Sequence, residues 1–498
     1  MVIVEKNNKM SVVARQSLKY SIVGYFSTLI GILSTVFLYP NDLEFAGKLQ
    51  FVFQTALLIL PVVALGIMHA NVRFFPKMSV NNQQQQLFKF SIVFIIANFL
   101  IGMGLLMLAV FVFPKLKMTD FWQMSPYILP MALLLALIQL CSKYISIKKR
   151  IVVPNIFENV FPKIGMVVAF ALFVFYQYSE ENSIVLYIGF FVLAFFGMMI
   201  YLNRLEKVSK KINFSFLKKE GFGRELMVYS FYTFLGSMGS VIALNIDATM
   251  IGELLTFSEV AIYNTSLNLV RMITVPALGV YTISAPIIAG YIAENNMKDL
   301  KALHYKTSFY LFAVGAVLFG LVAVGIEDLF ALMKNGHQLL KGLNVVYIMG
   351  FAFLFDLATG FNGYIISNSK YYKFNNTTTI ALAFLTISTN LVFLFWFKMG
   401  IVGVSLATAL SLTVYNLIKI IFNYKKFGVH PFGVKYLYVL GILLLVLCVG
   451  NVLPDFDNKF LSLCYKPLVG LMIFAIGNQI FNIILLKEVL PKSLFKDK

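Results

Sequence analysis

Seven ionisable side chains lie within or at the end of long apolar stretches of the sequence, where a charge is unfavourable. They are Glu158, Lys163, Asp247, Arg271, Asp356 and the pair His69 and Arg73. If these stretches cross a membrane, each charge costs about 2.5–3.5 kcal/mol on insertion scales and usually faces a cavity or a partner. The cations could bind a phosphate or another anion, and the carboxylates could carry a proton or bind a cation. These residues are the candidate functional residues of the chain.

Arg271 lies five residues before Pro276, inside a long apolar stretch. A guanidinium group at this place could hold a phosphate through paired hydrogen bonds. The alternative is a structural ion pair with Asp247 or Asp356. Asp356 lies near the middle of its own stretch and could instead take part in ion coupling.

The other candidates each have a structural interpretation beside the functional one. Arg73 could contact a second phosphate, or its side chain could extend toward a nearby membrane surface. His69 precedes it by four residues, which places both on one face of a helix. Lys163 could add positive potential, and Glu158 could neutralise it across a helical turn. Asp247 lies close to the end of its stretch and is either a latch of a closed state or simply exposed at the interface.

The elements that must position these residues are fourteen apolar stretches, which use most of the 498 residues. The chain is 59% hydrophobic and 13% charged, with a mean hydropathy of +0.83. A helix needs about 20 apolar residues to cross a bilayer. The predicted spans are 17–39, 46–70, 88–113, 124–147, 152–176, 183–203, 226–251, 258–290, 303–325, 340–367, 374–397, 401–424, 434–453 and 465–487. The composition therefore predicts an all-α integral membrane protein.

Lysine and arginine concentrate at alternate ends of these spans. Because such residues accumulate in short cytoplasmic loops, the pattern predicts that both termini are cytoplasmic. This orientation places Lys419 at a cytoplasmic end, and it places Lys459 and Lys466 at external ends, where acids such as Asp328 and Asp455 also lie. The formal charge of +19 is spread over many segments, which predicts contact with anionic membrane lipids and no binding of nucleic acid.

Cysteine and histidine usage predicts no metal site and no disulfide framework. The three cysteines and four histidines show no paired spacing. We therefore expect no cofactor, while coupling to protons or sodium ions through the carboxylates stays open.

A repeated pattern divides the chain. Tyr20-Ser21 and Tyr229-Ser230 each open a glycine- and serine-containing span, and each is followed by a second span that is expected to be broken at a proline, Pro61 or Pro276. A chance similarity of apolar segments is the alternative to a repeat, and repeats in transporters commonly place a binding site at their interface. The predicted parts are an N-terminal six-helix bundle at 1–203, a basic cytoplasmic linker at 204–224, a second six-helix bundle at 225–424, and two further spans with a cytoplasmic tail at 425–498.

Five short segments follow one another in the second half of the chain. They are Asp-Ala-Thr-Met-Ile-Gly at 247–252, Val-Ala-Ile-Tyr at 260–263, Thr-Gly-Phe-Asn-Gly at 359–363, Ser-Asn-Ser-Lys-Tyr-Tyr at 367–372 and Gly-Ile-Val-Gly-Val-Ser-Leu-Ala-Thr-Ala at 400–409. With Arg271 before Pro276 and the arrangement of six, six and two spans, the chain resembles the MOP superfamily and, within it, the Wzx-type polysaccharide flippases. The resemblance implies a MATE-like fold, in which two six-helix bundles surround a central cavity that opens alternately to each face, with two additional C-terminal helices.

The resemblance also implies a function. Such a flippase moves a polyprenyl-pyrophosphate-linked oligosaccharide across the bacterial cytoplasmic (inner) membrane during the synthesis of surface polysaccharide such as the O-antigen of lipopolysaccharide. The expected partners are this lipid-linked substrate, membrane lipids and polysaccharide-assembly proteins. Arg271 matches a cavity arginine of related lipid II flippases, which implies contact with the pyrophosphate. Those flippases carry further cavity cations in the first span, and this chain has none there, since Lys19 lies at the cytoplasmic end of the span.

The resemblance and the charge pattern together assign two sets of candidate residues. Those expected to bind substrate are Arg271, Arg73 and Lys163. Those expected to act in coupling or gating are Asp356, Asp247 and Glu158.

Two other functions compete with this interpretation. A MATE-type multidrug exporter would need an intramembrane carboxylate in its N-terminal bundle, and Glu158 is the sole candidate there, so the balance favours an anionic substrate. A glycosyltransferase or polymerase would need a large external loop or clustered catalytic carboxylates. The longest external segment, about 325–339, contains only Glu327 and Asp328 as acids, so we do not expect an enzyme.

Overall fold

The protein is described here by a computed structural model, which covers residues 12–79, 83–207, 209, 212–218 and 221–483. Within these residues the secondary structure is helical, without strands. Thirteen helices are long and apolar enough to cross a membrane, and the bent pair Phe257–Tyr281 and Ser284–Ala293 can form a fourteenth span. The prediction of an all-α membrane protein with about fourteen spans is therefore confirmed.

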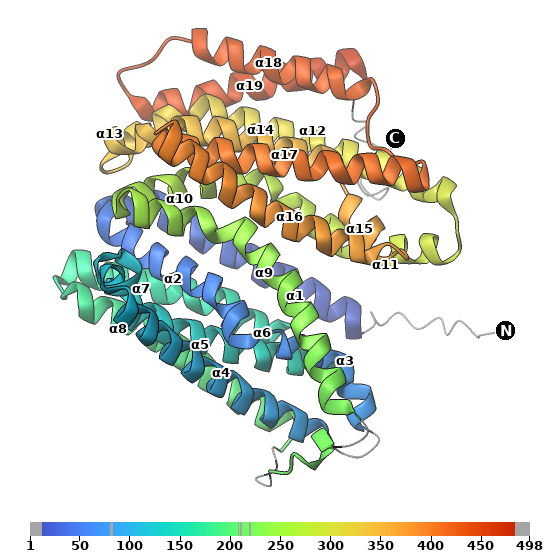
Figure 1. The fold of residues 1–498 in the computed structure, drawn as a ribbon. Coiled ribbons are helices and arrows are strands. Elements are labelled where there is room, and N and C mark those ends of the chain that lie inside the picture. Colours follow the sequence, from blue (N-terminus) through green and yellow to red (C-terminus); the bar gives the residue numbers. More distant parts are fainter. Residues whose placement is uncertain (1–11, 80–82, 208, 210–211, 219–220, 484–498) are drawn as a thin grey trace. The chain divides into compact units, whose positions relative to one another are not determined.

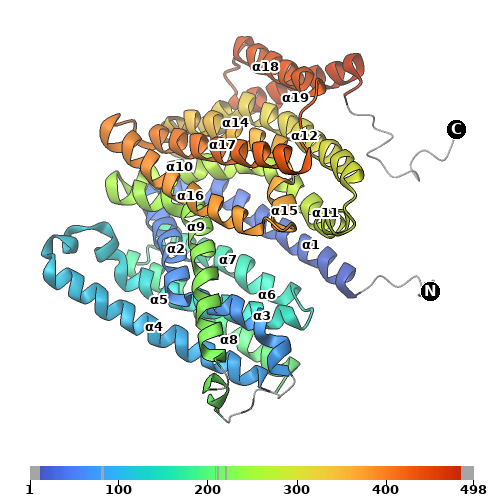
Figure 2. The same ribbon diagram turned by 45° about the vertical axis from the view of Figure 1, so that its right-hand side comes forward.

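The helices pack as two units, Met1–Val260 and Ala261–Lys498. The first unit extends beyond the linker at 204–224, because α9 (Phe222–Leu254) packs along α2 (Leu43–Ala64) and α3 (Ile67–Ser79), as Figure 2 shows. The linker thus lies within the first unit, whereas the sequence interpretation ends the first bundle before it. The division into six, six and two spans stays a prediction about the internal repeat.

Figure 1 labels the helices of the first unit and colours them in the order of the sequence. Besides α2, α3 and α9, its helices are α1 (Val12–Leu33), α4 (Gln84–Val112), α5 (Asp120–Ile147), α6 (Val152–Asn155), α7 (Phe161–Tyr176) and α8 (Glu180–Leu205). A π-helical turn, Ser34–Leu38, extends α1, and a second one, Ile156–Val160, joins α6 to α7. Short 3-10 turns lie at Tyr39–Asn41, Pro114–Met118 and Ser215–Lys218.

The second unit begins within α10 (Phe257–Arg271). Its other helices are α11 (Val275–Ala293), α12 (Met297–Leu332), α13 (Gly336–Leu339), α14 (Leu343–Thr359), α15 (Asn362–Ser367), α16 (Tyr372–Leu391), α17 (Gly400–Phe427), α18 (Lys435–Val452) and α19 (Lys459–Phe481). Its 3-10 turns are Met272–Thr274 and Leu340–Gly342, and a π-helical turn lies at Val392–Trp396.

Polar N-caps mark the starts of several spans, since the first N–H groups of a helix have no partner within it. Asp42 accepts a hydrogen bond from the Phe45 backbone at 2.9 Å at the start of α2. Thr119, Ser179, Asn296 and Asn458 cap α5, α8, α12 and α19 in the same way. These caps explain why the spans begin at polar residues beside each apolar stretch.

The second predicted span, 46–70, is broken in the structure. Helix α2 continues past Pro61 and ends at Leu65 and Gly66, which both have positive φ angles of 41° and 73°. A Cβ atom at Gly66 would lie 2.1 Å from the carbonyl oxygen of Ser230, so only glycine permits this close contact between the break and α9. The Tyr229-Ser230 pattern thus packs against the break, and residues 67–79 form the separate helix α3.

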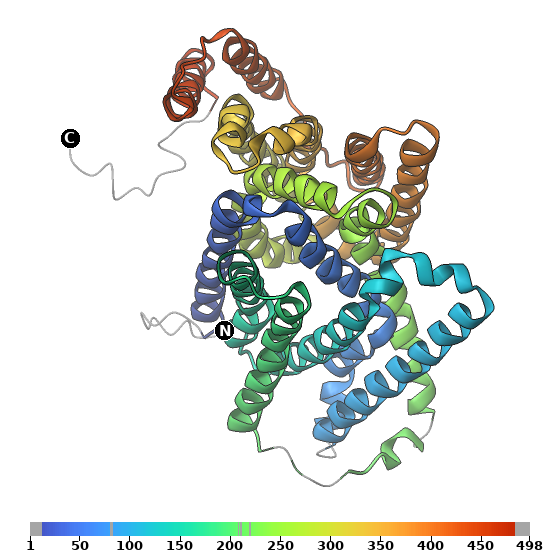
Figure 3. The same cartoon turned by 90° about the vertical axis from the view of Figure 1, so that its left-hand side faces the viewer.

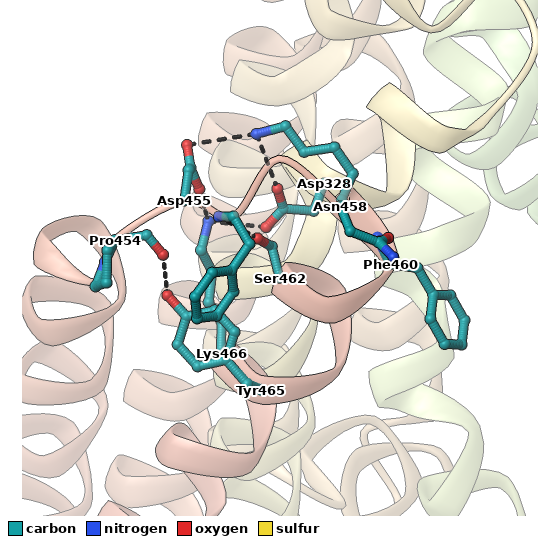
Figure 4. A network of polar contacts seen from close by, with 10 residues as sticks. Asp328, Pro454, Asp455, Asn458, Phe460, Ser462, Tyr465 and Lys466 are labelled. Atoms are coloured by element: carbon teal, nitrogen blue, oxygen red, sulfur yellow. Dashed lines mark hydrogen bonds and ion pairs between the residues drawn. The ribbon is translucent and has the colours of Figure 1, made fainter.

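In the second unit, α12 packs against α14, α18 and α19, and Figure 3 shows the last two helices beside it. Four charged side chains connect these helices at one end, as Figure 4 shows. Lys466 Nζ lies 2.8 Å from the Asp328 carboxylate and 2.5 Å from that of Asp455, and Lys459 Nζ lies 3.5 Å from both carboxylates. This network attaches the α18–α19 hairpin to α12.

Candidate functional site

Lys163 brings a positive charge to the surface of the first span. Its side chain extends from α7 to α1, where Nζ donates a hydrogen bond to the Ser27 carbonyl at 2.8 Å. A Cβ atom at Gly31, one turn further along α1, would lie 3.2 Å from the same Nζ. Ser27 in turn donates to the carbonyl of Asn159 at 2.8 Å. The apolar part of the first span, Ile22–Asn41, has no cation of its own, but the fifth predicted span supplies one.

Glu158 lies in the π-helical turn that precedes α7. Pro162 has no N–H group to donate to the carbonyl four residues earlier, which is that of Glu158, and this explains the wide turn at this point. The Glu158 side chain interacts with Ser142 and Lys143 of α5. The interpretation in which Glu158 neutralises Lys163 is therefore wrong: the described partner of Lys163 is the Ser27 carbonyl.

Arg73 faces α9 from α3. Its guanidinium carbon lies 4.5 Å from the ring centroid of Tyr229 and 6.0 Å from that of Phe74. The Arg73 side chain is exposed, and His69 is half-buried one turn earlier on α3. Neither sequence interpretation anticipated the aromatic contact, which gives the guanidinium a fixed position while leaving it open to a ligand.

Asp247 lies in α9, on the helix that packs against α2. Its side chain is only 7% exposed, so the interpretation that it is exposed at the interface is wrong. Close by, the hydroxyl groups of Thr249 and Thr55 form a hydrogen bond of 2.9 Å between α9 and α2. A role as a latch stays a prediction.

Arg271 ends α10, directly before the 3-10 turn that leads into α11. Its guanidinium carbon lies 5.9 Å from the ring centroid of Phe353 on α14. Asp356 follows Phe353 by three residues, so both lie on the same face of α14. The Asp356 Oδ1 atom accepts a hydrogen bond of 2.9 Å from Asn416 on α17. Arg271 thus approaches α14 one helical turn before Asp356, and the ion-pair alternatives for Arg271 stay predictions.

Lys419 is a further charged residue inside the second unit. The charge pattern predicts a cytoplasmic end for it, but its side chain is 5% exposed. Helix α17 continues to Phe427, eight residues or about 12 Å beyond Lys419, so the lysine lies well within the helix. Its Nζ atom donates to the Tyr415 hydroxyl group and lies 3.9 Å from the centroid of that ring.

Asn416 and Lys419 form a polar face of α17 together with Tyr415. Asn416 binds Asp356, and Lys419 lies one turn further along and interacts electrostatically with the same carboxylate. The sequence does contain a signal of this polar face. Asn416 and Lys419 are three residues apart within an apolar stretch, so they share a helix face. The charge rule conceals this signal, since it counts every lysine near a span end as a loop residue.

Aromatic residues lie next to this polar face. The ring of Tyr281 on α11 is 5.3 Å from that of Phe361 and 5.7 Å from that of Tyr364. Tyr281 also interacts electrostatically with Asp356. Lys419, Asp356 and several hydroxyl groups therefore lie in one part of the second unit, and Arg271 approaches α14 at Phe353. A cation together with hydroxyl groups suits an anionic or hydroxyl-rich ligand.

Metal chemistry has no support among the described residues, where no group of three or more histidine, cysteine or acidic side chains could hold an ion. Cys141 is buried, Cys448 and Cys464 are exposed, and all three are free thiols.

Comparison with known proteins identifies the fold. No protein-family profile and no curated protein sequence matches the chain. Among solved structures, the lipid II flippase MurJ in an inward closed conformation matches with a TM-score of 0.68 and 16% identity, over 93% of this chain and 98% of MurJ. A MATE protein in complex with MaL6 matches with a TM-score of 0.55 and 12% identity, over 84% of this chain and 96% of that protein.

A third match is a MOP superfamily transporter from Pyrococcus furiosus, described by the reverse polarity of its binding pocket. It has a TM-score of 0.50 and 14% identity and covers 84% of this chain and 95% of the transporter. At such identities the similarity establishes the fold alone. The chain has the fold of the MOP superfamily, which the lipid II flippase MurJ and the MATE transporters share.

Proposed function

We propose that the protein is a flippase that moves a polyprenyl-pyrophosphate-linked oligosaccharide across the bacterial cytoplasmic membrane. The solved structures that match this fold include a lipid II flippase and transporters, which supports a transport function over an enzymatic one. The match to MurJ also extends over more of the chain than the matches to the MATE proteins. In the proposed cycle the two units open alternately to each face of the membrane.

The observation that carries the proposal is the positive charge inside each unit. Lys163 is held against α1 in the first unit, and Arg271 lies beside Phe353 in the second. A pyrophosphate has several anionic oxygens, which guanidinium and ammonium groups bind through charge-assisted hydrogen bonds. The apolar tail of the substrate can stay in the bilayer, so only the charged head group and its sugars need a polar path.

The proposal gives the candidate residues distinct roles. Arg271 and Lys163 bind the pyrophosphate, and Arg73 binds it at the cytoplasmic end, where its contact with Tyr229 orients the guanidinium. In this proposal the hydroxyl groups of Tyr281 and Tyr364 bind sugar hydroxyls. Asp247 and Glu158 act in gating, and the negative charge of Asp356 offsets part of the positive charge of the second unit. Proteins of polysaccharide assembly supply the substrate and receive it.

Translocation in proteoliposomes tests the proposal. A fluorescent polyprenyl-pyrophosphate oligosaccharide is placed in both leaflets, and its exposure to an external quencher is followed with time. We expect the wild type to translocate the lipid and Arg271→Ala to lower the rate about 10- to 100-fold, because a hydrogen bond to a charged group contributes about 1.5–3 kcal/mol. Lys301→Ala, which changes an exposed lysine of α12, serves as the matched control and should keep the wild-type rate. A wild type that leaves the lipid in place would contradict the proposal.

The second candidate function is a cation-coupled multidrug exporter. Structures of MATE transporters match the fold, and both units contain an intramembrane carboxylate, Glu158 and Asp356. Ethidium efflux from the same vesicles, driven by a proton or sodium gradient, distinguishes this function. Efflux that depends on Glu158 or Asp356, together with no movement of the lipid, would support the exporter.

A further inference from the structure

Lys419 has the surroundings of a bound cation. Its ammonium group donates to the Tyr415 hydroxyl group, which also lies 3.3 Å from the hydroxyl of Thr379. A Cβ atom at Gly363 would lie 3.2 Å from Lys419 Nζ and 3.7 Å from Asn375 Oδ1. That Oδ1 atom is buried and has no hydrogen-bond partner in the described part of the chain. The Tyr415 hydroxyl therefore contacts the ammonium group directly, and the Thr379 hydroxyl and the Asn375 amide oxygen lie in the same region.

The Asp356 carboxylate completes this oxygen-rich region. Its Oδ1 atom is held by Asn416 Nδ2 at 2.9 Å, and Asn416 precedes Lys419 by one helical turn. Carboxylate, amide and hydroxyl oxygens are the ligands that hard cations prefer. The elements α14, α16 and α17 each contribute one or more of these oxygens, so the region has the donor set of a monovalent cation site.

A positive charge is needed at this place. Asp356 is half-buried. A carboxylate withdrawn from water is unfavourable unless it is paired or hydrogen-bonded, and one amide donor does not neutralise it. Lys419 interacts electrostatically with Asp356 and is itself buried. The ammonium group of Lys419 on α17 therefore acts on the Asp356 carboxylate of α14 through space, and no direct ion pair joins the two among the described residues.

We propose that Lys419 is an internal counter-cation, whose ammonium group fills an oxygen-lined monovalent cation site of the second unit and neutralises Asp356. The consequence is that Asp356 needs no sodium ion, and that sodium coupling at this carboxylate is blocked by the protein's own side chain. This inference concerns the second unit alone and does not depend on the identity of the transported substrate.

Removal of the ammonium group tests the proposal. In Lys419→Ala the whole site is vacated, whereas in Lys419→Met an uncharged side chain of similar length still fills it. Thermal unfolding of the purified full-length protein in detergent is measured in sodium chloride, ethylammonium chloride or choline chloride at equal ionic strength. We expect the Tm of Lys419→Ala to rise in sodium or ethylammonium relative to choline, because a ligand that binds only the folded state stabilises it. The Tm values of the wild type and of Lys419→Met should be the same in all three salts.

The carboxylate provides the second control. In the double variant Asp356→Asn with Lys419→Ala, the response to sodium and ethylammonium should disappear. A folded Lys419→Ala protein without any cation response would overturn the proposal. If that variant does not fold, the wild type is compared with Asp356→Asn. We expect sodium to change the Tm of neither protein. A sodium-dependent Tm of the wild type that is lost in Asp356→Asn would also overturn the proposal.

Discussion

Lys163 shows how a charge can act far from its place in the sequence. It belongs to α7, but its ammonium group lies against α1 at Ser27 and Gly31. We expect Lys163→Met to lower flippase activity about 10-fold, because the variant loses a charge-assisted contact to the pyrophosphate. Lys163→Arg keeps the charge and should retain most of the activity. Equal rates for Lys163→Met and the wild type, in vesicles with equal amounts of protein, would exclude Lys163 from substrate binding.

Individual charged residues could be recognised from the sequence, but their partners could not. The cost of a charge in an apolar stretch is a local property, which is why Asp356 and Arg271 stand out without a structure. The partner of Lys163 is a backbone carbonyl 136 positions away in the chain, and backbone carbonyls leave no sequence signature. The burial of Lys419 is equally invisible to the charge rule, which registers only that a lysine lies near the end of a span.

The α18–α19 hairpin depends on a small number of ionic contacts with α12. Asp328 is 1% exposed and lies 2.8 Å from Lys466, whereas Asp455 is exposed. We expect Lys466→Met to destabilise the protein on the order of 3–5 kcal/mol, because it leaves Asp328 buried with a weaker partner. Asp455→Asn, the matched control at the exposed end of the network, should cost about 0–1 kcal/mol. Thermal unfolding in detergent measures both, and equal effects of the two variants would contradict the assigned roles.

A second ionic contact joins α5 to the end of α8. Burial of Glu206 acts to raise its pKa, but hydrogen bonds from Lys148 and Gln85 outweigh burial and lower the pKa below the ordinary value of 4.5. A carboxylate with a lowered pKa contributes stability above its unfolded pKa and loses it as the pH falls through its folded pKa. We therefore expect the Tm to fall when the pH is lowered from about 6 to below about 4.5, and Glu206→Gln to reduce this fall. An unchanged pH dependence in Glu206→Gln would show that other carboxylates cause it.

The existence of the spans was predictable, whereas their breaks and packing were not. Span length follows from bilayer thickness and hydropathy, so helices such as α5 and α12 agree with the predicted positions. The break after α2 lies at Leu65 and Gly66 rather than at Pro61, because the close approach of Ser230 on α9 requires a glycine there. Contacts between helices that are far apart in the sequence also place α9 in the first unit.

The net charge of the proposed substrate gives the transport cycle a direction. Outward movement of an anion is favoured by an inside-negative potential, by about 2.3 kcal/mol for each charge and each 100 mV. If the Lys419 ammonium group occupies the cation site at Asp356, no sodium gradient acts there, and the potential becomes the natural driving force. We expect a valinomycin-induced, inside-negative potential to speed outward translocation of the pyrophosphate lipid, while replacement of sodium by choline has no effect. A rate that follows sodium and not the potential would contradict this account.

The most direct test of the central claim uses two substrates in one preparation of vesicles. Proteoliposomes that contain the wild type receive either a fluorescent polyprenyl-pyrophosphate oligosaccharide or ethidium, and transport of each is measured with Arg271→Ala and Lys301→Ala alongside. The account predicts translocation of the anionic lipid by the wild type and by Lys301→Ala, a rate reduced about 10- to 100-fold in Arg271→Ala, and no efflux of ethidium. Efflux of ethidium without translocation of the lipid would contradict it.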